Sequence, residues 1–333
     1  MGKIAFTQVS AKRSGGNAWV KEVLEALASD ASFLVETIDV SAKKFTGQRI
    51  LKSLETVWNL LKLKGKKDIW LRNFYSVVFL NRRRQPGKNV AFIFHIDFSG
   101  FSTSVKPFLI MMEKFVFYPQ LKKMDAIVVV SEYWKQHFVK RGYKNVHKIY
   151  GVFEENVIAV TDQEVADFTI KYGLAQKPII YLGNCQVAKG AVDAYEALKT
   201  IDAHLVTSGT REVTIDAKNL DLSLQEYFVL LKASTIVLTM SKFKEGWCRT
   251  THEAMLLKTP VIGSGMGGMR ELLEGGKQIV CEDFSGLKES VIKLLGNEQL
   301  RKKIGEDGYA YAKGFTKEKF TKAWLDLMHN VSK

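Results

Sequence analysis

The stretch that decides the fold runs from Ser241 to Gly263 and reads SKFKEGWCRTTHEAMLLKTPVIG. An apolar run, Thr235–Thr239, precedes it, and a second apolar run, Pro260–Gly263, ends it. Between the two runs, Thr250–Leu257 is predicted as a helix. Short apolar runs on either side of a helix are typical of buried parallel strands. The stretch therefore predicts a β-α-β unit whose first loop starts at the carboxyl end of a strand.

The same alternation continues through the second half of the chain. Further buried strands are predicted at Pro178–Leu182, Ala203–Thr207 and Gln278–Cys281. Further helices are predicted at Ala191–Lys199, Leu224–Lys232, Met269–Leu273 and Phe284–Leu295. This order is typical of an α/β fold with a doubly wound sheet.

The first half repeats the pattern. Strands are predicted at Ile4–Val9, Phe33–Ile38, Asp68–Trp70, Val90–Ile96 and Ala126–Val130. Helices are predicted at Asn17–Ser29, Gln48–Lys64 and Glu132–Arg141. Because 333 residues exceed a comfortable single core, we expect two α/β domains, 1–155 and 156–315. The boundary is expected near Glu154–Gln163, where the polar stretch Thr161–Glu164 follows a strand-like run. The final helix, Thr316–Met328, has no strand after it, and we expect the segment 316–333 to pack back on the first domain.

Two carboxylates stand out in the opening stretch. Glu245 lies in the predicted loop and Glu253 in the predicted helix, so the loop presents one to a ligand and the helix presents the other. Thr250 or Thr251 is expected to cap that helix. The free amides of residues 248–250 at the helix start form a natural phosphate site. The pattern favours a phosphate-bearing ligand that reaches both loop and helix.

This stretch resembles the E-x7-E signature of retaining glycosyltransferases with the GT-B fold, especially family 4, the glycosyltransferases group 1. The family's loop is commonly Glu-Gly-Phe-Gly, and its helix carries Glu-Ala-Met, which is intact here. The resemblance implies two Rossmann-like domains facing across a cleft. It implies that Glu245 contacts the donor sugar as a catalytic residue, and that Glu253 holds the ribose hydroxyls. The other loop residues that it places on the donor are Trp247, Cys248, Arg249 and Thr250.

A second element agrees with this resemblance. Tyr181–Gly190 follows a predicted strand and precedes a predicted helix, like the family's element in which an Arg and a Lys grip the donor diphosphate. Lys189 matches the Lys, but Asn184 stands where the family has Arg. The resemblance therefore places Lys189 on the diphosphate. Arg249 is the candidate to supply the missing positive charge.

Weaker matches lie in the first half. Gly15 and Gly16 follow the first strand and open a helix, where the family brings bare backbone against the donor phosphates. His95 stands near the end of the predicted strand Val90–Ile96, at an edge where the family often has a His near the transferred sugar. His95 is therefore a second catalytic candidate, and Gly15 and Gly16 are donor-binding candidates. Ser131 is interpreted as a helix cap.

The resemblance also implies the reaction. A hexosyl-type sugar moves, with retention of configuration, from a UDP- or GDP-linked donor to a glycan or lipid-linked acceptor, as in the synthesis of cell-envelope polysaccharides or glycoconjugates. Positive charge and amide dipoles stabilise the departing diphosphate. The chain contains no Asp-x-Asp, so a metal-clamped diphosphate is not expected. No cofactor and no metal are expected.

Positive charge is concentrated in the first half. Residues 1–150 hold 26 Lys and Arg against 11 Asp and Glu, and the rest of the chain holds 23 against 24. One half is therefore expected to face something anionic, either nucleic acid or an anionic lipid surface.

The predicted helix Gln48–Lys64 carries an apolar stripe beside several lysines, and Arg82, Arg83 and Arg84 follow. The stripe is expected to be the core face of the helix, the usual reason for such a pattern. The alternative is a membrane interface, because aromatic and basic residues are interleaved in this region. The cations favour a peripheral enzyme on the cytoplasmic membrane face, with Arg82, Arg83 and Arg84 at the membrane or the acceptor.

Two other functions fit parts of the sequence. Gly263–Gly268 satisfies G-x-G-x-x-G after a strand, and Asp283 follows in the place of the acidic residue of an NAD-dependent oxidoreductase. The helix after these glycines is short, and no catalytic set follows it. Lys62–Lys67 and the three arginines could contact the phosphates of a nucleic acid, but the sequence shows no known nucleic-acid-binding module there. No nucleic-acid partner is therefore expected.

The location is expected to be cytoplasmic. The chain has no uninterrupted apolar run of about 18 residues, and its first residues lack the apolar block of a signal peptide. Its cysteines, Cys185, Cys248 and Cys281, are odd in number and far apart, which is typical of a reducing compartment.

Overall fold

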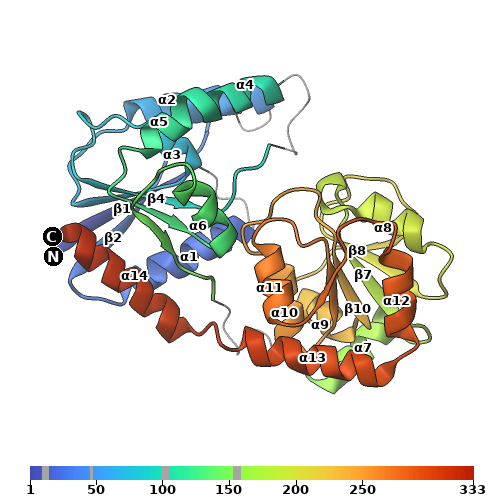
Figure 1. Cartoon of the computed structure of the whole chain (residues 1–333). Helices are drawn as coiled ribbons and strands as arrows, with labels where there is room; N and C mark the ends of the chain where they lie inside the picture. The colour runs from blue at the N-terminus through green and yellow to red at the C-terminus, as the bar shows by residue number, and fades with distance from the viewer. Residues whose placement is uncertain (10–14, 46–47, 99–104, 153–158) are drawn as a thin grey trace. The chain divides into compact units, whose positions relative to one another are not determined.

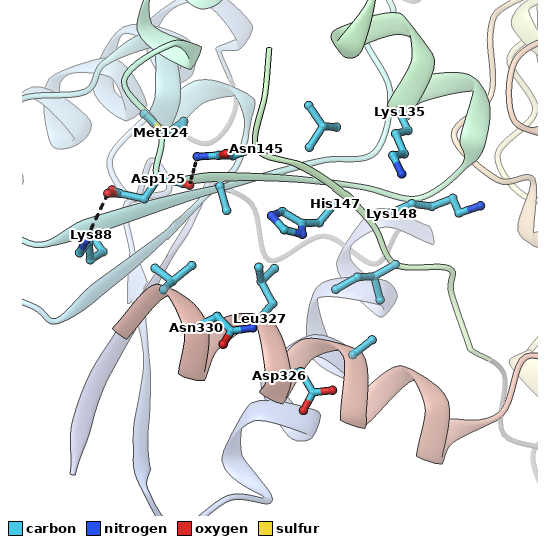
Figure 2. A pocket seen from close by; sticks show the side chains of 15 residues that line it. Lys88, Met124, Asp125, Lys135, Asn145, His147, Lys148, Asp326, Leu327 and Asn330 are labelled. Atoms are coloured by element: carbon cyan, nitrogen blue, oxygen red, sulfur yellow. Dashed lines mark hydrogen bonds and ion pairs between the residues drawn. The ribbon is translucent and has the colours of Figure 1, made fainter. Parts of the chain in front are cut away.

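A computed structural model describes residues 1–9, 15–45, 48–98, 105–152 and 159–333 (Figure 1). The chain forms two compact units, each with its own six-stranded sheet. Unit 1 contains Met1–Val130, Trp134–Val152 and Lys317–Lys333, and unit 2 contains Ser131–Tyr133 and Phe153–Thr316. The predicted α/β fold class, with two doubly wound parallel sheets, is confirmed.

The sheet of unit 1 has the strand order β2-β1-β3-β4-β5-β6, and every pairing is parallel. The strands are β1 Gly2–Gln8, β2 Phe33–Asp39, β3 Ile69–Arg72, β4 Lys88–Ile93, β5 Ala126–Val129 and β6 Val146–Lys148. The helices are α1 Gly15–Ala28, α2 Arg49–Lys62, α3 Phe74–Val78, α4 Lys106–Met112, the π-helix η1 Glu113–Phe117, α5 Tyr118–Leu121, α6 Glu132–Val139 and α14 Lys317–Ser332. All residues of β3 and β5 are buried, because helices cover both faces of a parallel sheet.

The last helix, α14, belongs to unit 1 and packs along α1. Its Trp324 is fully buried and meets Phe92 of β4 edge to face, with ring centroids 5.0 Å apart. Its His329 lies 2.8 Å from the carboxylate of Asp30. A segment from the far end of the sequence thus completes the core of the first unit.

The sheet of unit 2 has the strand order β12-β11-β10-β7-β8-β9, again with parallel pairings. The strands are β7 Ile179–Asn184, β8 His204–Ser208, β9 Lys218–Leu220, β10 Ile236–Thr239, β11 Val261–Gly263 and β12 Ile279–Val280. The helices are α7 Asp162–Lys171, the short 3-10 helix η3 Val187–Lys189, α8 Ala191–Leu198, α9 Leu224–Ala233, α10 Arg249–Leu256, α11 Met269–Gly275, α12 Leu287–Leu295 and α13 Glu298–Ala312. Within the described ranges, no helix of either unit has the length and apolar character needed to cross a bilayer.

The strand order of unit 2 reverses between β7 and β10. β7 and β10 are neighbours, although the chain passes through β8 and β9 between them. From β7 the order runs outward to one side and from β10 to the other, so the loops that leave these two strands separate at the carboxyl edge. Lys189 follows β7 and Glu245 follows β10. The topology therefore brings the loops of these two predicted site residues to one place.

Two predicted boundaries at candidate site residues are wrong. β4 ends at Ile93, so His95 lies in the loop beyond the strand and is exposed. α10 starts at Arg249 with Cys248 as its N-cap, so neither Thr250 nor Thr251 caps it. Cys248 has left-handed backbone angles, φ 55° and ψ 84°, which turn the chain into the helix before either threonine is reached.

The apolar stripe on α2 is not a core face, and that expectation is wrong for most of its length. Between Leu51 and Lys62 only Leu60 is buried. Leu54, Trp58 and Leu61 are exposed.

Candidate active site

Glu245 and Lys189 meet where the loops after β10 and β7 leave the carboxyl edge of the unit 2 sheet. The Lys189 ammonium lies 2.5 Å from Oε1 of Glu245, and the hydroxyl of Ser241 donates to the same oxygen at 2.6 Å. Glu245 is buried, whereas the Lys189 side chain is partly exposed. The Lys189 ammonium also lies 4.8 Å from the ring centroid of Phe243. The carboxylate is thus fixed from two sides, and the cation that fixes it reaches solvent.

A glycine pair holds the Glu245 loop in place. The amide of Glu245 donates to the carbonyl of Met266 at 3.1 Å, and the amide of Gly268 donates to the carbonyl of Glu245 at 2.9 Å. Gly267 has φ 71°, and a Cβ there would lie 2.5 Å from the Glu245 carbonyl oxygen. A Cβ on Gly268 would lie 1.9 Å from the carbonyl oxygen of Gly246. These glycines are therefore required by the close approach of two loops.

The Lys189 loop is fixed to the same strand end. Gly190 has φ 73°, and a Cβ there would lie 2.3 Å from the carbonyl oxygen of Met240, just after β10. The amide of Lys242 donates to the carbonyl of Ala188 at 2.8 Å. Backbone contacts thus join the two loops, and these contacts fix the position of the Lys189 backbone relative to the end of β10.

Glu253 lies on α10 and is buried among polar groups. Its Oε1 is 3.5 Å from Nε of Arg249, and its Oε2 accepts a hydrogen bond from the hydroxyl of Tyr227 at 3.1 Å. The Tyr227 hydroxyl also lies 3.0 Å from the Thr250 hydroxyl. Burial raises the pKa of Glu253 above its ordinary value, and the Arg249 charge and the Tyr227 hydrogen bond oppose that rise. The sequence predicts Glu253 as a site residue but does not predict Tyr227. Tyr227 lies in helix α9, where a single tyrosine among apolar residues carries no functional signal.

The loop between the two glutamates packs its large side chain inward. Trp247 is fully buried, and its indole N–H donates to Nδ1 of His252 at 3.0 Å. Nε2 of His252 lies 3.1 Å from the carbonyl of Ala312, and Phe315 meets both rings. Burial lowers the pKa of His252 to about 3, so the ring is neutral and the indole proton fits its acceptor nitrogen. Trp247 therefore anchors the loop through its buried side chain.

Cys248 occupies the turn into α10. Thr251 donates a hydrogen bond to its sulfur at 3.2 Å. Burial raises the pKa of the Cys248 thiol to about 11, so the thiol stays protonated at neutral pH. The first amides of the eight-residue helix α10 follow directly, and helix starts of this kind favour anions. Arg249, the first residue of the helix, is directed to Glu253.

The remaining predicted residues have other surroundings. Asn184 is exposed at the end of β7 and accepts a hydrogen bond from the buried Tyr181 hydroxyl at 3.2 Å. Gly15 and Gly16 begin α1 in unit 1, and Ser14 before them lies outside the described residues. His95 and the three arginines Arg82, Arg83 and Arg84 are exposed on loops of unit 1. Unit 2 by itself brings together Lys189, Glu245, Arg249 and Glu253.

Comparison with known proteins finds a family match within unit 2. Residues 168–311 match the family model described as Glycosyl transferases group 1. The N-acetyl-alpha-D-glucosaminyl L-malate synthase of Bacillus anthracis is 24% identical over 208 residues, which are 56% of this chain and 54% of that protein. The chain thus aligns with about half the length of this relative.

Solved structures share the fold over the whole chain. A sucrose-phosphate synthase from Thermosynechococcus elongatus superposes with a TM-score of 0.81 at 17% identity, covering 99% of both chains. HepE from Anabaena, in complex with UDP-glucose, gives 0.78 at 16% identity, covering 99% of this chain and 100% of HepE. Identities this low establish architecture and nothing finer. The chain therefore has the two-domain α/β fold of the GT-B glycosyltransferases, as its sequence predicts.

Proposed function

We propose that this protein is a retaining glycosyltransferase that moves a hexosyl group from a nucleotide-diphosphate sugar to a glycan or lipid-linked acceptor. The observation that carries the proposal is the pairing of Lys189 with Glu245 at the carboxyl edge of β7 and β10, beside the start of α10. A strand-order switch with a helix start is a site suited to a nucleotide phosphate. The match of residues 168–311 to a glycosyltransferase family model supports it.

The donor diphosphate is assigned to Lys189 and to the first amides of α10. Lys189 is partly exposed, so a diphosphate can approach its ammonium from solvent and share it with Glu245. Arg249 supplies a second positive charge at the helix start and is also partly exposed. As the sugar leaves, charge grows on the diphosphate, and these fixed cations and dipoles stabilise it without reorganising. We propose that this stabilisation needs no metal ion.

The sugar and the ribose are assigned to the two glutamates. Glu245 is held by Ser241 and Lys189, so its carboxylate is preorganised to accept hydrogen bonds from sugar hydroxyls. Glu253 is proposed to accept the ribose hydroxyls, with Tyr227 holding its other oxygen. Because HepE was solved with UDP-glucose, this is the first donor to test.

The experiment measures binding and turnover separately. Calorimetric titration with UDP, GDP and NAD identifies the nucleotide, and release of nucleotide from a panel of UDP- and GDP-sugars identifies the donor. The proposal expects binding of UDP or GDP and donor hydrolysis that stops when Glu245 is replaced. Binding of NAD with no binding of either nucleoside diphosphate would overturn it. The oxidoreductase alternative is not favoured, because Gly267 and Gly268 are already required for the contact with the Glu245 loop.

We further propose that the acceptor belongs to cell-envelope polysaccharide or glycoconjugate synthesis. The excess of positive charge in residues 1–150 supports an anionic or membrane-bound acceptor. Transfer from the identified donor to membrane extracts, compared with soluble glycans, tests this choice.

A further inference from the structure

Unit 1 carries an apolar surface that its own core does not use. Among the residues that the structure describes, ten of the seventeen exposed large hydrophobic side chains lie between Phe45 and Phe115. Most of the ten belong to α2 and to the helical segment of α4 and η1, and α2 and α4 run along the top of unit 1 in Figure 1. Soluble proteins scatter such side chains singly, whereas a gathered set marks an interaction site.

The helical segment from α4 to α5 is anchored only in its second half. Its buried residues are Phe117 and Leu121, and Phe117 stacks on Phe74 with ring centroids 4.5 Å apart. None of the seven residues of α4 is buried, although five of them are Phe, Leu, Ile and Met. Phe115 is 66% exposed. The first turns therefore offer their apolar side chains to the surroundings while the base of the segment is fixed in the core.

Helix α2 offers a second set of apolar side chains. Leu54 is 59% exposed and Trp58 is 57% exposed, and Leu61 continues the same stripe. The ammonium of Lys62 lies 4.6 Å from the ring centroid of Trp58. A ring under a cation, at the edge of an apolar stripe, suits a boundary between lipid headgroups and hydrocarbon.

A basic loop connects the ends of these helices. The guanidinium of Arg84 donates to the carbonyl of Leu61 near the end of α2 at 3.2 Å, and that of Arg82 donates to the carbonyl of Lys123, just after α5. We call the docking surface the exposed apolar side chains of both helical segments together with this loop. Its apolar members are Leu54, Trp58, Leu61, Phe108, Ile110, Met111 and Phe115.

Charge around the docking surface is mainly positive. Residues 43–67, 82–84 and 106–123 together hold fifteen Lys and Arg against two Glu, and three of these cations, Lys43, Lys67 and Arg82, form ion pairs with carboxylates outside these ranges. The exposed lysines beside the apolar members include Lys64, Lys66 and Lys114. The excess of positive charge favours an anionic partner.

We propose that the docking surface binds the face of an anionic lipid bilayer, with its apolar side chains among the headgroups and its cations on the lipid phosphates. A second copy of this chain is disfavoured as the occupant, because a two-fold interface would bring the same cations face to face. A nucleic acid is disfavoured, because exposed Ile, Met and Leu side chains offer no hydrogen bonds to phosphates or bases. The biological use, bringing the enzyme to a membrane-bound acceptor, rests on the proposed function; the binding itself does not.

Vesicle sedimentation without any donor tests the proposal. The full chain is mixed with vesicles of phosphatidylcholine alone, or of phosphatidylcholine with phosphatidylglycerol. Binding is expected only with phosphatidylglycerol, and it should weaken as salt is raised. Replacing Phe108, Ile110 and Phe115 together by Ser is expected to weaken binding at least about tenfold. Replacing Lys64, Lys66 and Lys114 by Ser is expected to weaken it and to reduce its dependence on salt.

A matched control uses exposed apolar residues of unit 2. Ile170 is 72% exposed and Ile292 is 52% exposed, and their joint replacement by Ser should leave vesicle binding unchanged. Thermal melting of each variant verifies that it folds. No binding to anionic vesicles at low salt, or equal binding by the Phe108, Ile110 and Phe115 variant, would overturn the proposal. So would a dimer, seen by light scattering, that this variant converts to a monomer. Nucleotide titration of the same samples reports on the proposed function separately.

Discussion

Lys189 and Glu245 are 56 positions apart in the chain, yet their charged groups lie 2.5 Å apart. Each stands in a loop that leaves a central strand of unit 2, and those strands are neighbours because the strand order reverses between them. The buried carboxylate of Glu245 holds the Lys189 ammonium at the carboxyl edge of the sheet. The ion pair positions Lys189 and still leaves its side chain partly exposed to solvent.

Replacing Lys189 by Ala is expected to weaken the binding of a nucleoside diphosphate far more than that of the nucleoside. The loss should be about 10- to 100-fold, from about 1.5–3 kcal/mol for hydrogen bonds to a charged group. Calorimetric titration with UDP and uridine measures both. The control is Lys199→Ala, which removes an exposed lysine paired with Glu196 on the same unit. Equal losses for UDP and uridine would contradict a contact with the diphosphate.

Replacing Glu253 by Gln is expected to separate stability from binding. Burial raises the pKa of Glu253, so the folded chain holds its proton more tightly than the unfolded chain does. The free energy of unfolding therefore falls as pH rises from the ordinary value of 4.5 through the folded pKa. Gln is uncharged, so it removes the free-energy cost of burying a charged carboxylate, and the variant should melt at a higher temperature than wild type at neutral pH. Its nucleotide affinity should fall by about 1–3 kcal/mol.

Glu226 provides a control of opposite sign. Its pKa is lowered to about 2, chiefly by hydrogen bonds from Lys171 and Ser223. It therefore contributes stability above pH 4.5 that is lost as pH falls toward 2. Glu226→Gln should melt lower than wild type at neutral pH and bind nucleotide normally. Melting curves between acid and neutral pH distinguish the two variants. Wild-type nucleotide affinity in Glu253→Gln would remove Glu253 from the donor site.

The two-sheet fold could be predicted, and the two glutamates of the candidate site could be proposed, because their signals are local. Buried parallel strands appear as short apolar runs, and the sequence from Glu245 to Glu253 lies within one strand–loop–helix unit. Helix α7 is absent from the predicted helices for a reason that is also local. Its polar start, Thr161 to Glu164, resembles a domain boundary, whereas it is a capping box in which each side chain bonds the backbone of the other.

Features that depend on distant neighbours could not be predicted. Nothing in the sequence of α2 indicates that Leu54 and Trp58 are left exposed by the elements that the structure describes. Ser241 contacts Glu245 and Tyr227 contacts Glu253 in the folded chain. Neither contact could be predicted, because a serine after a strand and a tyrosine in a helix are common and carry no signal of their partners. The left-handed backbone of Cys248 could not be predicted either, because glycine is the residue that usually indicates this conformation.

A chelator is expected to leave donor hydrolysis largely unchanged. In the proposed reaction Lys189, Arg249 and the amides of α10 compensate the charge of the diphosphate, so no divalent ion is required. Nucleotide release from the preferred donor is measured with and without EDTA, after dialysis of the chain against the same chelator. Activity abolished by EDTA and restored by a divalent metal would show that the metal-free proposal is wrong.

The last prediction concerns Gly268, the residue that seats the Glu245 loop. Its φ of −69° is ordinary, so replacement by Ala strains nothing in the backbone itself. The new Cβ would instead lie 1.9 Å from the carbonyl oxygen of Gly246 and 2.5 Å from Oγ of Ser131. The loop must then move, at a cost of about 1–3 kcal/mol of stability, as for other overpacked sites.

Because the displaced loop carries Glu245, Gly268→Ala should also lower turnover more than nucleotide binding. The matched control is Gly286→Ala, where a Cβ would meet only the sulfur of Cys281 at 3.9 Å. Melting temperature, UDP affinity and donor turnover are measured for both variants. If Gly268→Ala were as stable and as active as wild type, the glycine pair would not be holding the loop. The alternative function of Gly263–Gly268, binding a dinucleotide in an oxidoreductase, would then have to be considered again.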